Sequence, residues 1–271
     1  MNLIPMPHAA MPTMALLMMI AAAPAAADGD MPQPGREGLH GAIGLGVGVR
    51  PAYEGSGENQ TRLTPNIRLF YGDTWFLSGM SAGANLFRHR TAQDISISAG
   101  PMLALRHGRE EGDHAELRGL GDIDRSLDAG GFIRLHKGGW QARADLRKDV
   151  SNGDGGTTLR LSAGYGMPVS QKLRLRANLD TAWASSAYMS TFYGIDATQS
   201  ANSGIAQYTA GAGFKHVGAS LMADYAISRE WGGFASLRHT RLIGDAADSP
   251  IVATLGSRNQ VAASVGVNYR F

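Results

Sequence analysis

The chain has 271 residues, no cysteine, 36 glycines and a formal net charge of +2. The lack of cysteine excludes disulfides and cysteine metal sites, and so small a charge, without a concentrated basic run, gives no support to nucleic-acid binding. A charged fraction of only 18% with this much glycine argues against a helical protein and suits tight turns and closely approaching strands.

The amino-terminal segment has the pattern of a secretory signal peptide. An apolar run starts at Met11 and ends in small residues at Ala27, and polar residues follow. We predict a signal peptide over residues 1–27, cleaved after Ala27, although no Lys or Arg precedes the apolar run. An uncleaved anchor is the alternative, but the run is shorter than the ~20 residues of a membrane-spanning helix. Residues 28–37 are predicted to form a periplasmic spacer, and residues 38–271 the folded domain.

The rest of the chain alternates between apolar and polar residues, as strands do when opposite faces meet oil and water. Residues 39–50 place leucine, isoleucine and valine on one face and mostly glycine on the other. Later stretches, such as residues 141–147 and 172–180, carry charges on the second face. An apolar exterior around a wet lumen is typical of an outer-membrane β-barrel. The chain is therefore predicted to be an all-β, closed antiparallel transmembrane barrel.

The same alternation selects ten charged residues as candidates for the lumen lining: Arg134, Arg143, Asp145, Arg147, Arg160, Arg174, Arg176, Asp180, Asp224 and Arg238. Arginine outnumbers aspartate in this set. In a narrow barrel such charges usually pair across strands and fill the interior. A filled lumen is thus one prediction, and an open, anion-preferring pore is the other.

Connector lengths predict the number of strands. Long links are expected near residues 52–61, 108–127, 149–157, 184–208 and 243–257, and short turns near Gly72, Gly138, Val169 and Arg229. Bacterial barrels place their short turns in the periplasm. The alternation of long and short links holds only if residues 74–90 are split into two strands at residues 78–83, which are rich in turn-forming types. This gives twelve strands, and ten strands with one hairpin outside the wall is the alternative, because each half is shorter than the ~9–11 residues of a spanning strand.

Aromatic residues near the predicted strand ends suggest two girdles at the membrane boundaries. They are Tyr71, Trp75, Trp140, Tyr165, Trp183, Tyr225, Trp231 and Tyr269.

The last twelve residues alternate almost without fault and end on Phe271. An edge strand of a soluble sandwich is the alternative. In a closed barrel the last strand must pair with the first, because an unpaired edge in hydrocarbon leaves backbone groups unsatisfied. We therefore predict that Val261–Phe271 pairs with residues 41–49, with its odd-numbered side chains outward. The glycines at 44, 46 and 48 would then make room in the lumen for Arg270 or a neighbouring long side chain. The terminal Tyr269 and Phe271 also resemble the signal that the outer-membrane insertion machinery reads.

No sequence motif carries recognisable chemistry. Gly44–Gly48 has its third glycine in the wrong place for a nucleotide loop, and no Walker, HExxH or GxSxG sequence occurs. His107, Asp113, His114 and Asp122 share one loop, which could serve a hydrolase, but a solvated charged loop is the simpler interpretation. We predict no catalytic, cofactor or metal site, and the protein is not expected to be an enzyme.

Several short elements together resemble the MltA-interacting protein (MipA/OmpV) family. They are residues 51–56 (Pro-Ala-Tyr-Glu-Gly-Ser), 71–76 (Tyr-Gly-Asp-Thr-Trp-Phe), 119–121 (Gly-Leu-Gly), 248–250 (Asp-Ser-Pro) and 269–271 (Tyr-Arg-Phe). The likeness covers about residues 38–271. It implies an outer-membrane barrel and, for the founding type, a non-enzymatic scaffold that joins a lytic murein transglycosylase to a penicillin-binding protein. Other members are described as porin-like proteins or adhesins, so a small channel for anionic or polar solutes, or a surface adhesin, is the alternative function. The family supplies no catalytic residues.

Overall fold

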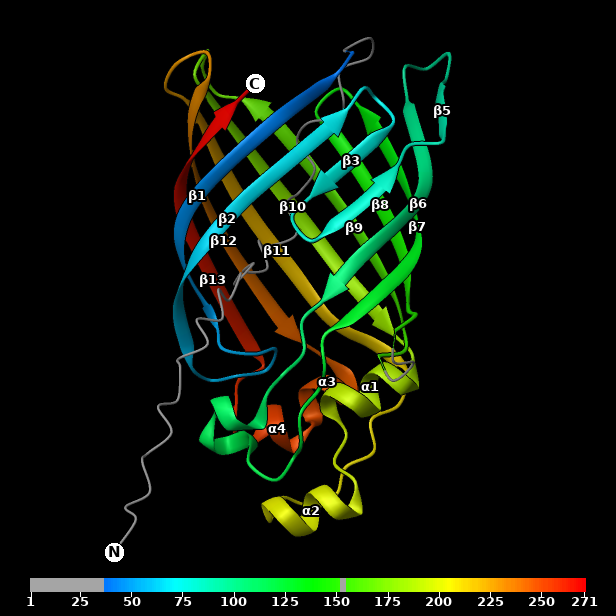
Figure 1. The fold of residues 1–271 in the computed structure, drawn as a ribbon, viewed down its shortest axis with the longest axis vertical. Helices are drawn as coiled ribbons and strands as arrows, with labels where there is room; N and C mark the ends of the chain where they lie inside the picture. The colour runs from blue at the N-terminus through cyan, green and yellow to red at the C-terminus, as the bar shows by residue number, and fades with distance from the viewer. Residues whose placement is uncertain (1–36, 152–154) are drawn as a thin grey trace, which may run out of the picture.

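The computed structural model describes residues 37–151 and 155–271. The predicted signal peptide and all but the last residue of the predicted spacer lie outside the described residues. The described chain forms one antiparallel sheet of thirteen strands that closes on itself through an additional pairing of β4 with β6 (Figure 1). The strands are β1 (Leu39–Pro51), β2 (Asn59–Tyr71), β3 (Trp75–Ser78), β4 (Ser81–Ala84), β5 (Phe87–Arg90), β6 (Ser96–Arg106), β7 (Ser126–Lys137), β8 (Trp140–Asp149), β9 (Thr157–Pro168), β10 (Leu173–Ala184), β11 (Gly213–Ala226), β12 (Trp231–Leu242) and β13 (Asn259–Arg270).

The thirteen strands occupy twelve positions around the wall. β4 and β5 both pair with β6, β4 at residues 102–104 and β5 at residues 96–99, so they are two pieces of one wall strand. The predicted split of residues 74–90 is confirmed, because β3 and β4 form a hairpin that turns at Gly79 and Met80. Gly79 has φ +56°, a conformation that glycine adopts at no steric cost. The twelve-strand prediction is therefore right and the ten-strand alternative is wrong.

β1 and β13 close the barrel as predicted. Their register runs from Ala42 opposite Arg270 to Val49 opposite Ala263. The odd-numbered residues of both strands point outward, and Val47 and Val265 are each about half exposed to the surrounding medium. The space beside Gly46 is occupied by a neighbouring long side chain, which is one of the two predicted occupants. Phe234 of β12, not Arg270, lies over Gly46, where an added Cβ would come within 2.9 Å of the Phe234 ring.

The two ends of the barrel differ, as Figure 1 shows. One end carries short turns and the carboxyl terminus. The other carries the long links, which fold into small helices beneath the barrel mouth: the 3-10 helices η1 (Glu111–Asp113) and η2 (Ala115–Leu117), and the α-helices α1 (Ser186–Tyr193), α2 (Ala197–Ser203), α3 (Gly244–Asp248) and α4 (Pro250–Ala253). We call this folded set of links the cap. In the described chain, no helix has the length and apolar character needed to cross a membrane.

Local sequence explains the two longer helices of the cap. Ser185 is the N-cap of α1, and its hydroxyl accepts the backbone N–H of Tyr188. Asp196 and Gln199 form a capping box at α2, each side chain accepting the backbone N–H of the other residue. These interactions satisfy backbone groups that a helix end otherwise leaves unpaired.

The prediction of two aromatic girdles is only half right. Seven of the eight residues lie towards the short-turn end, and five of them are more than 45% exposed: Tyr71, Trp75, Trp140, Tyr225 and Trp231. Rings with one polar edge suit a membrane boundary there. Trp183 alone of the eight is at the cap end, beside Phe214 across the strand pair. Seven of the eight predicted aromatic residues therefore form a single girdle at the short-turn end.

Candidate functional site

Strand alternation brings nine of the ten predicted lining residues into the barrel interior at intermediate or full burial; Arg174, near the short-turn end of β10, is exposed. Arg134, Asp145, Arg176 and Asp180 are buried, with relative exposures of 5–7%. Buried charge is costly unless it is paired and hydrogen-bonded. The positions of their partners therefore decide whether the lumen is filled or open.

Asp180 is the centre of one charge network. Its carboxylate accepts hydrogen bonds from Arg238 at 2.7 and 2.8 Å, lies 3.1 Å from His216 Nε2, and is 3.6 Å from the guanidinium of Arg160. These four residues come from strands β9 to β12. The network therefore connects four neighbouring strands on the lumenal face of the wall.

Two further pairs line the same interior. Arg143 donates to both oxygens of Asp145 at 2.7 and 2.8 Å, and Arg176 donates to Asp224 at 2.7 Å. Charge-assisted contacts of this length are among the stronger hydrogen bonds in proteins. These pairs place hydrogen-bonded charges on the lumenal side of β8, β10 and β11.

Arg134 adds an aromatic contact. Its guanidinium carbon lies 4.6 Å from the ring centre of Phe76 and 4.4 Å from that of Phe132. These rings belong to a buried apolar cluster completed by Phe70, Met102 and Ala104. A cation over an aromatic face gains about 1–2 kcal/mol when it is shielded from water, so this cluster fills the lumen beside the β3–β4 hairpin.

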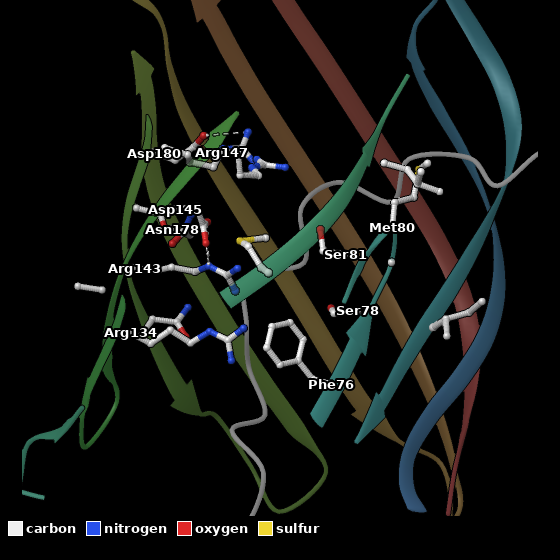
Figure 2. Close-up of a pocket in the computed structure, with 18 of the residues that line it drawn as sticks. Phe76, Ser78, Met80, Ser81, Arg134, Arg143, Asp145, Arg147, Asn178 and Asp180 are labelled. Carbon is white, nitrogen blue, oxygen red and sulfur yellow. Dashed lines mark hydrogen bonds and ion pairs between the residues drawn. The ribbon is translucent and has the colours of Figure 1, made fainter. Parts of the chain in front are cut away.

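A cavity of about 230 Å³ remains in the lumen, and Figure 2 shows it between the β3–β4 hairpin and the charged wall. Its lining includes five arginines, Arg134, Arg143, Arg147, Arg160 and Arg238, but only two aspartates, Asp145 and Asp180. Among the described residues, the Nε atom of Arg147 is buried without a hydrogen-bond partner. The cavity is thus an electropositive chamber suited to an anion.

The cap closes the opposite end of the interior from the short turns. Its apolar residues form two clusters, one around Tyr188, Met189 and Tyr193 and the other around Leu117 and Ile251. Leu117, Met189, Tyr193 and Ile251 are each no more than 1% exposed. Four different links therefore contribute to these two clusters, and Tyr208 packs against both.

Glu54, in the link after β1, joins the cap to the wall. Its carboxylate pairs with Lys215 of β11 at 2.5 Å and accepts the hydroxyl of Tyr188 of α1 at 3.3 Å. Burial alone would raise the pKa of Glu54, but the charges of Lys215 and His216 lower it to about 2. The carboxylate therefore stays ionised at every pH at which the barrel is expected to work.

A second group of polar residues meets at the cap surface. Ligand atoms of Glu58, His114 and Glu116 lie within 4.8 Å of one another, and Gln60 Nε2 is 3.2 Å from His114 Nε2. The sequence analysis predicted no metal ligands, and the two links that meet here are more than fifty residues apart. Carboxylate and imidazole groups can bind divalent metals. Glu58 is exposed, however, and His114 and Glu116 are only half-buried. His114 and Glu116 also form hydrogen bonds with Gln60 and Tyr53.

Sequence reasoning missed two buried residues that take part in the ion pairs, Lys215 and His216. Lys215 and His216 stand at the start of β11, beside the register shift at Ala182 and Trp183 that turns both of them inward. Period two alone places only one of two adjacent residues inside, so the bulge hides this site from the sequence. Arg106 of β6, which pairs with Asp128 of β7 at 2.8 Å, was also absent from the predicted lumen lining.

Comparison with known proteins identifies the family. The family model described as MltA-interacting protein MipA matches residues 43–271. The chain belongs to the MipA family. The MltA-interacting protein of Escherichia coli (strain K12) is 24% identical over 233 residues, which is 85% of this chain and 91% of the relative. YiaT of the same strain, whose name assigns it provisionally to the outer membrane, is 28% identical over 85% of this chain and 90% of the relative. Neither name is that of an enzyme.

Solved structures with a similar fold are outer-membrane barrels. The KdgM porin aligns with a TM-score of 0.42 at 11% identity, covering 85% of this chain and 99% of its own. The NanC porin aligns with a TM-score of 0.42 at 8% identity, covering 84% of this chain and all of its own. The family match and the closed antiparallel barrel, rather than these weak alignments, identify the protein as a MipA-family β-barrel of the bacterial outer membrane, in contact with membrane lipid. Short turns of such barrels face the periplasm, so we expect the cap to be extracellular.

Proposed function

We propose that this MipA-family barrel is a non-enzymatic scaffold that holds peptidoglycan-remodelling enzymes, a lytic murein transglycosylase and a penicillin-binding protein, at the inner face of the outer membrane. The observation that carries the proposal is the arrangement of the interior, in which paired charges line the lumen and a folded cap lies over its extracellular end. A barrel of this kind offers its surfaces to partners. The name of the E. coli relative, which covers 85% of this chain, supports the same proposal.

The periplasmic rim has one element suited to docking. All four residues of β5 are exposed, and the hairpin that β5 forms with β6 stands at the short-turn end (Figure 1). Arg88 holds this hairpin to the β2–β3 turn through a 2.6 Å contact with Asp73. Arg90 is 68% exposed, and its ion-pair partner among the residues that the structure describes is the equally exposed Asp94. An arginine presented on a fixed hairpin can recognise carboxylates of a partner.

Affinity capture tests the proposal. The tagged protein, solubilised from membranes in mild detergent, should recover a transglycosylase and a penicillin-binding protein. Arg90→Glu should reduce this recovery, whereas the matched change Arg258→Glu on the extracellular cap should leave it intact. Clean capture that recovers neither enzyme would overturn the scaffold proposal.

The basic cavity favours a second candidate, a small channel for anionic solutes. Five arginines against two aspartates would attract anions if the lumen were continuous with water. The cap and the paired charges around Asp180 argue against such a channel. Planar-bilayer recordings of the refolded protein discriminate, because a stable anion-selective conductance would support the channel and its absence the scaffold.

Tyr269 and Phe271 are proposed to be the assembly signal. Both rings face outward at the periplasmic end of the wall, with centres 6.4 Å apart, where a periplasmic insertion machinery could reach them.

A further inference from the structure

The wall of the barrel is incomplete in its extracellular half. β2 has thirteen residues, but β3 pairs only with the last four, Arg68–Tyr71. One further bond, from the N–H of Gly79 to the carbonyl of Ile67, ends the contact. Within residues 37–151 and 155–271, residues 59–66 therefore have β1 on one side and no strand on the other. At ~3.3 Å per residue this edge is about 26 Å long.

The opening lies at the depth of the lipid chains. Leu63, in the middle of the uncovered edge, is 65% exposed and is in register with Val47, which in turn faces Val265. All three are outward apolar residues. On the other side of the opening, the outward Leu105 is 51% exposed, and its N–H donates to the carbonyl of Met80 at the tip of the β3–β4 hairpin. Figure 1 shows β2 and β6 diverging below this hairpin.

The sequence of β2 fits an edge that stays open. The bond to the Ile67 carbonyl fixes which backbone groups face the opening, because the backbone groups of successive residues point alternately to the two sides of a strand. The backbone groups of Pro65 and Leu63 therefore face the opening, on the same side of β2 as the Ile67 carbonyl. Proline has no N–H to leave unsatisfied there. In a membrane, such backbone is tolerated only where it lines a polar cavity or is covered by protein.

The opening leads to the electropositive cavity. Ile67, Met80 and Leu105 belong to the cavity lining together with the arginines of β7, β8 and β9 (Figure 2). The mouth is thus apolar and the interior basic. His107, at the same edge, has a buried Nε2 atom with no hydrogen-bond partner in the described chain, as does Arg147 at its Nε. An anionic oxygen would satisfy such groups.

We propose that this opening admits a phosphate-bearing lipid from the outer leaflet, whose headgroup binds in the arginine-lined cavity while its acyl chain stays between β2 and β6. A volume of about 230 Å³ suits a headgroup and not a whole lipid. A ligand that is apolar at one end and anionic at the other matches the two ends of the site. This binding is independent of the scaffold function.

Calorimetric titration of the refolded protein in a neutral alkyl-maltoside detergent tests the proposal, with dodecyl phosphate and inorganic phosphate as the two probes. Dodecyl phosphate should bind, and inorganic phosphate should bind at least tenfold more weakly, because it lacks the chain. Arg147→Gln should weaken dodecyl phosphate binding about tenfold, the loss expected for one charge-assisted contact. Arg174→Gln, an inward arginine that is outside the cavity lining, is the matched control and should leave the affinity unchanged.

The route through the wall is tested separately. Met80→Trp should narrow the mouth and weaken or slow dodecyl phosphate binding, whereas Met167→Trp, on the lipid face of β9, should not. Heat-modifiable electrophoretic mobility confirms that each variant is folded. No binding to the unaltered protein, equal binding of inorganic phosphate, an equal loss in Arg174→Gln, or an unaffected Met80→Trp would each overturn the proposal.

Discussion

Replacing Glu54 with glutamine should loosen the extracellular cap. Glu54 contacts Lys215 on the wall and Tyr188 on α1, and Lys215 is only 7% exposed. The substitution keeps the shape of the side chain and removes its charge. Lys215 is then left buried without the carboxylate that offsets its desolvation.

The size of the effect follows from the burial of the two partners. Breaking a fully buried ion pair from one side costs about 3–5 kcal/mol. The side chain of Glu54 is 36% exposed, however, so water already screens part of the attraction between Glu54 and Lys215. We expect a loss of about 1–3 kcal/mol in the free energy of unfolding. Adding Lys215→Met should restore part of this loss, because it removes the orphaned charge.

Urea titration of the refolded protein, followed by tryptophan fluorescence, measures the loss. The matched control is Asp248→Asn, which breaks an exposed pair with Arg258 in the same cap and should cost less than about 1 kcal/mol.

The pH dependence gives the sharper test. The folded-state pKa of Glu54 is lowered to about 2 from an ordinary value of 4.5. The contribution of the ionised Glu54 to the free energy of unfolding is therefore complete above pH 4.5 and is lost as the pH falls towards 2. The stability difference between the unaltered protein and Glu54→Gln should be present at pH 7 and shrink to near zero by pH 2. A difference that stays constant over this range would refute the assignment of the pair.

Three further predictions concern the closure of the wall. Gly46→Val should lower the free energy of unfolding, measured by urea titration, by about 1–3 kcal/mol. A Cβ at this position would lie 2.5 Å from the Val265 carbonyl oxygen. A neutral effect would contradict the close approach of β1 and β13. Deletion of Phe271 should lower the yield of heat-modifiable barrel in cells far more than deletion of a cap residue, and equal yields would exclude its role as an assembly signal. The chain has no cysteine, so introduced cysteines can be tested without background. Val47→Cys with Val265→Cys should cross-link on oxidation, whereas Val47→Cys with Ser264→Cys should not, since Ser264 faces the lumen. The reverse result would show a slipped register.

The wall could be predicted from the sequence because strands with oil outside and water inside must alternate. That rule selected the lining residues and the pairing of β1 with β13. The turn at Gly79 followed from the parity of long and short links rather than from any strand signal. The sequence also indicated that each half of residues 74–90 is short for a spanning strand, but only the structure shows that this leaves a lateral opening beside β2.

The cap and the charge networks could not be predicted in the same way. The capping box of Asp196 and Gln199 is a local signal that could have placed α2. The contact of Glu54 with Lys215 joins residues 161 positions apart and depends on the bulge in β10 and β11, which has no simple sequence pattern. Likewise, the choice of Phe234 over Arg270 beside Gly46 depends on the register of three strands.

Photo-crosslinking in intact cells tests the scaffold function most directly. A photoreactive residue at His89 lies on the exposed β5 strand of the periplasmic rim, and one at Asp248 lies on the extracellular cap. We expect adducts with a lytic transglycosylase or a penicillin-binding protein from position 89 and none from position 248. Adducts with these enzymes from neither position, or only from position 248, would contradict the account.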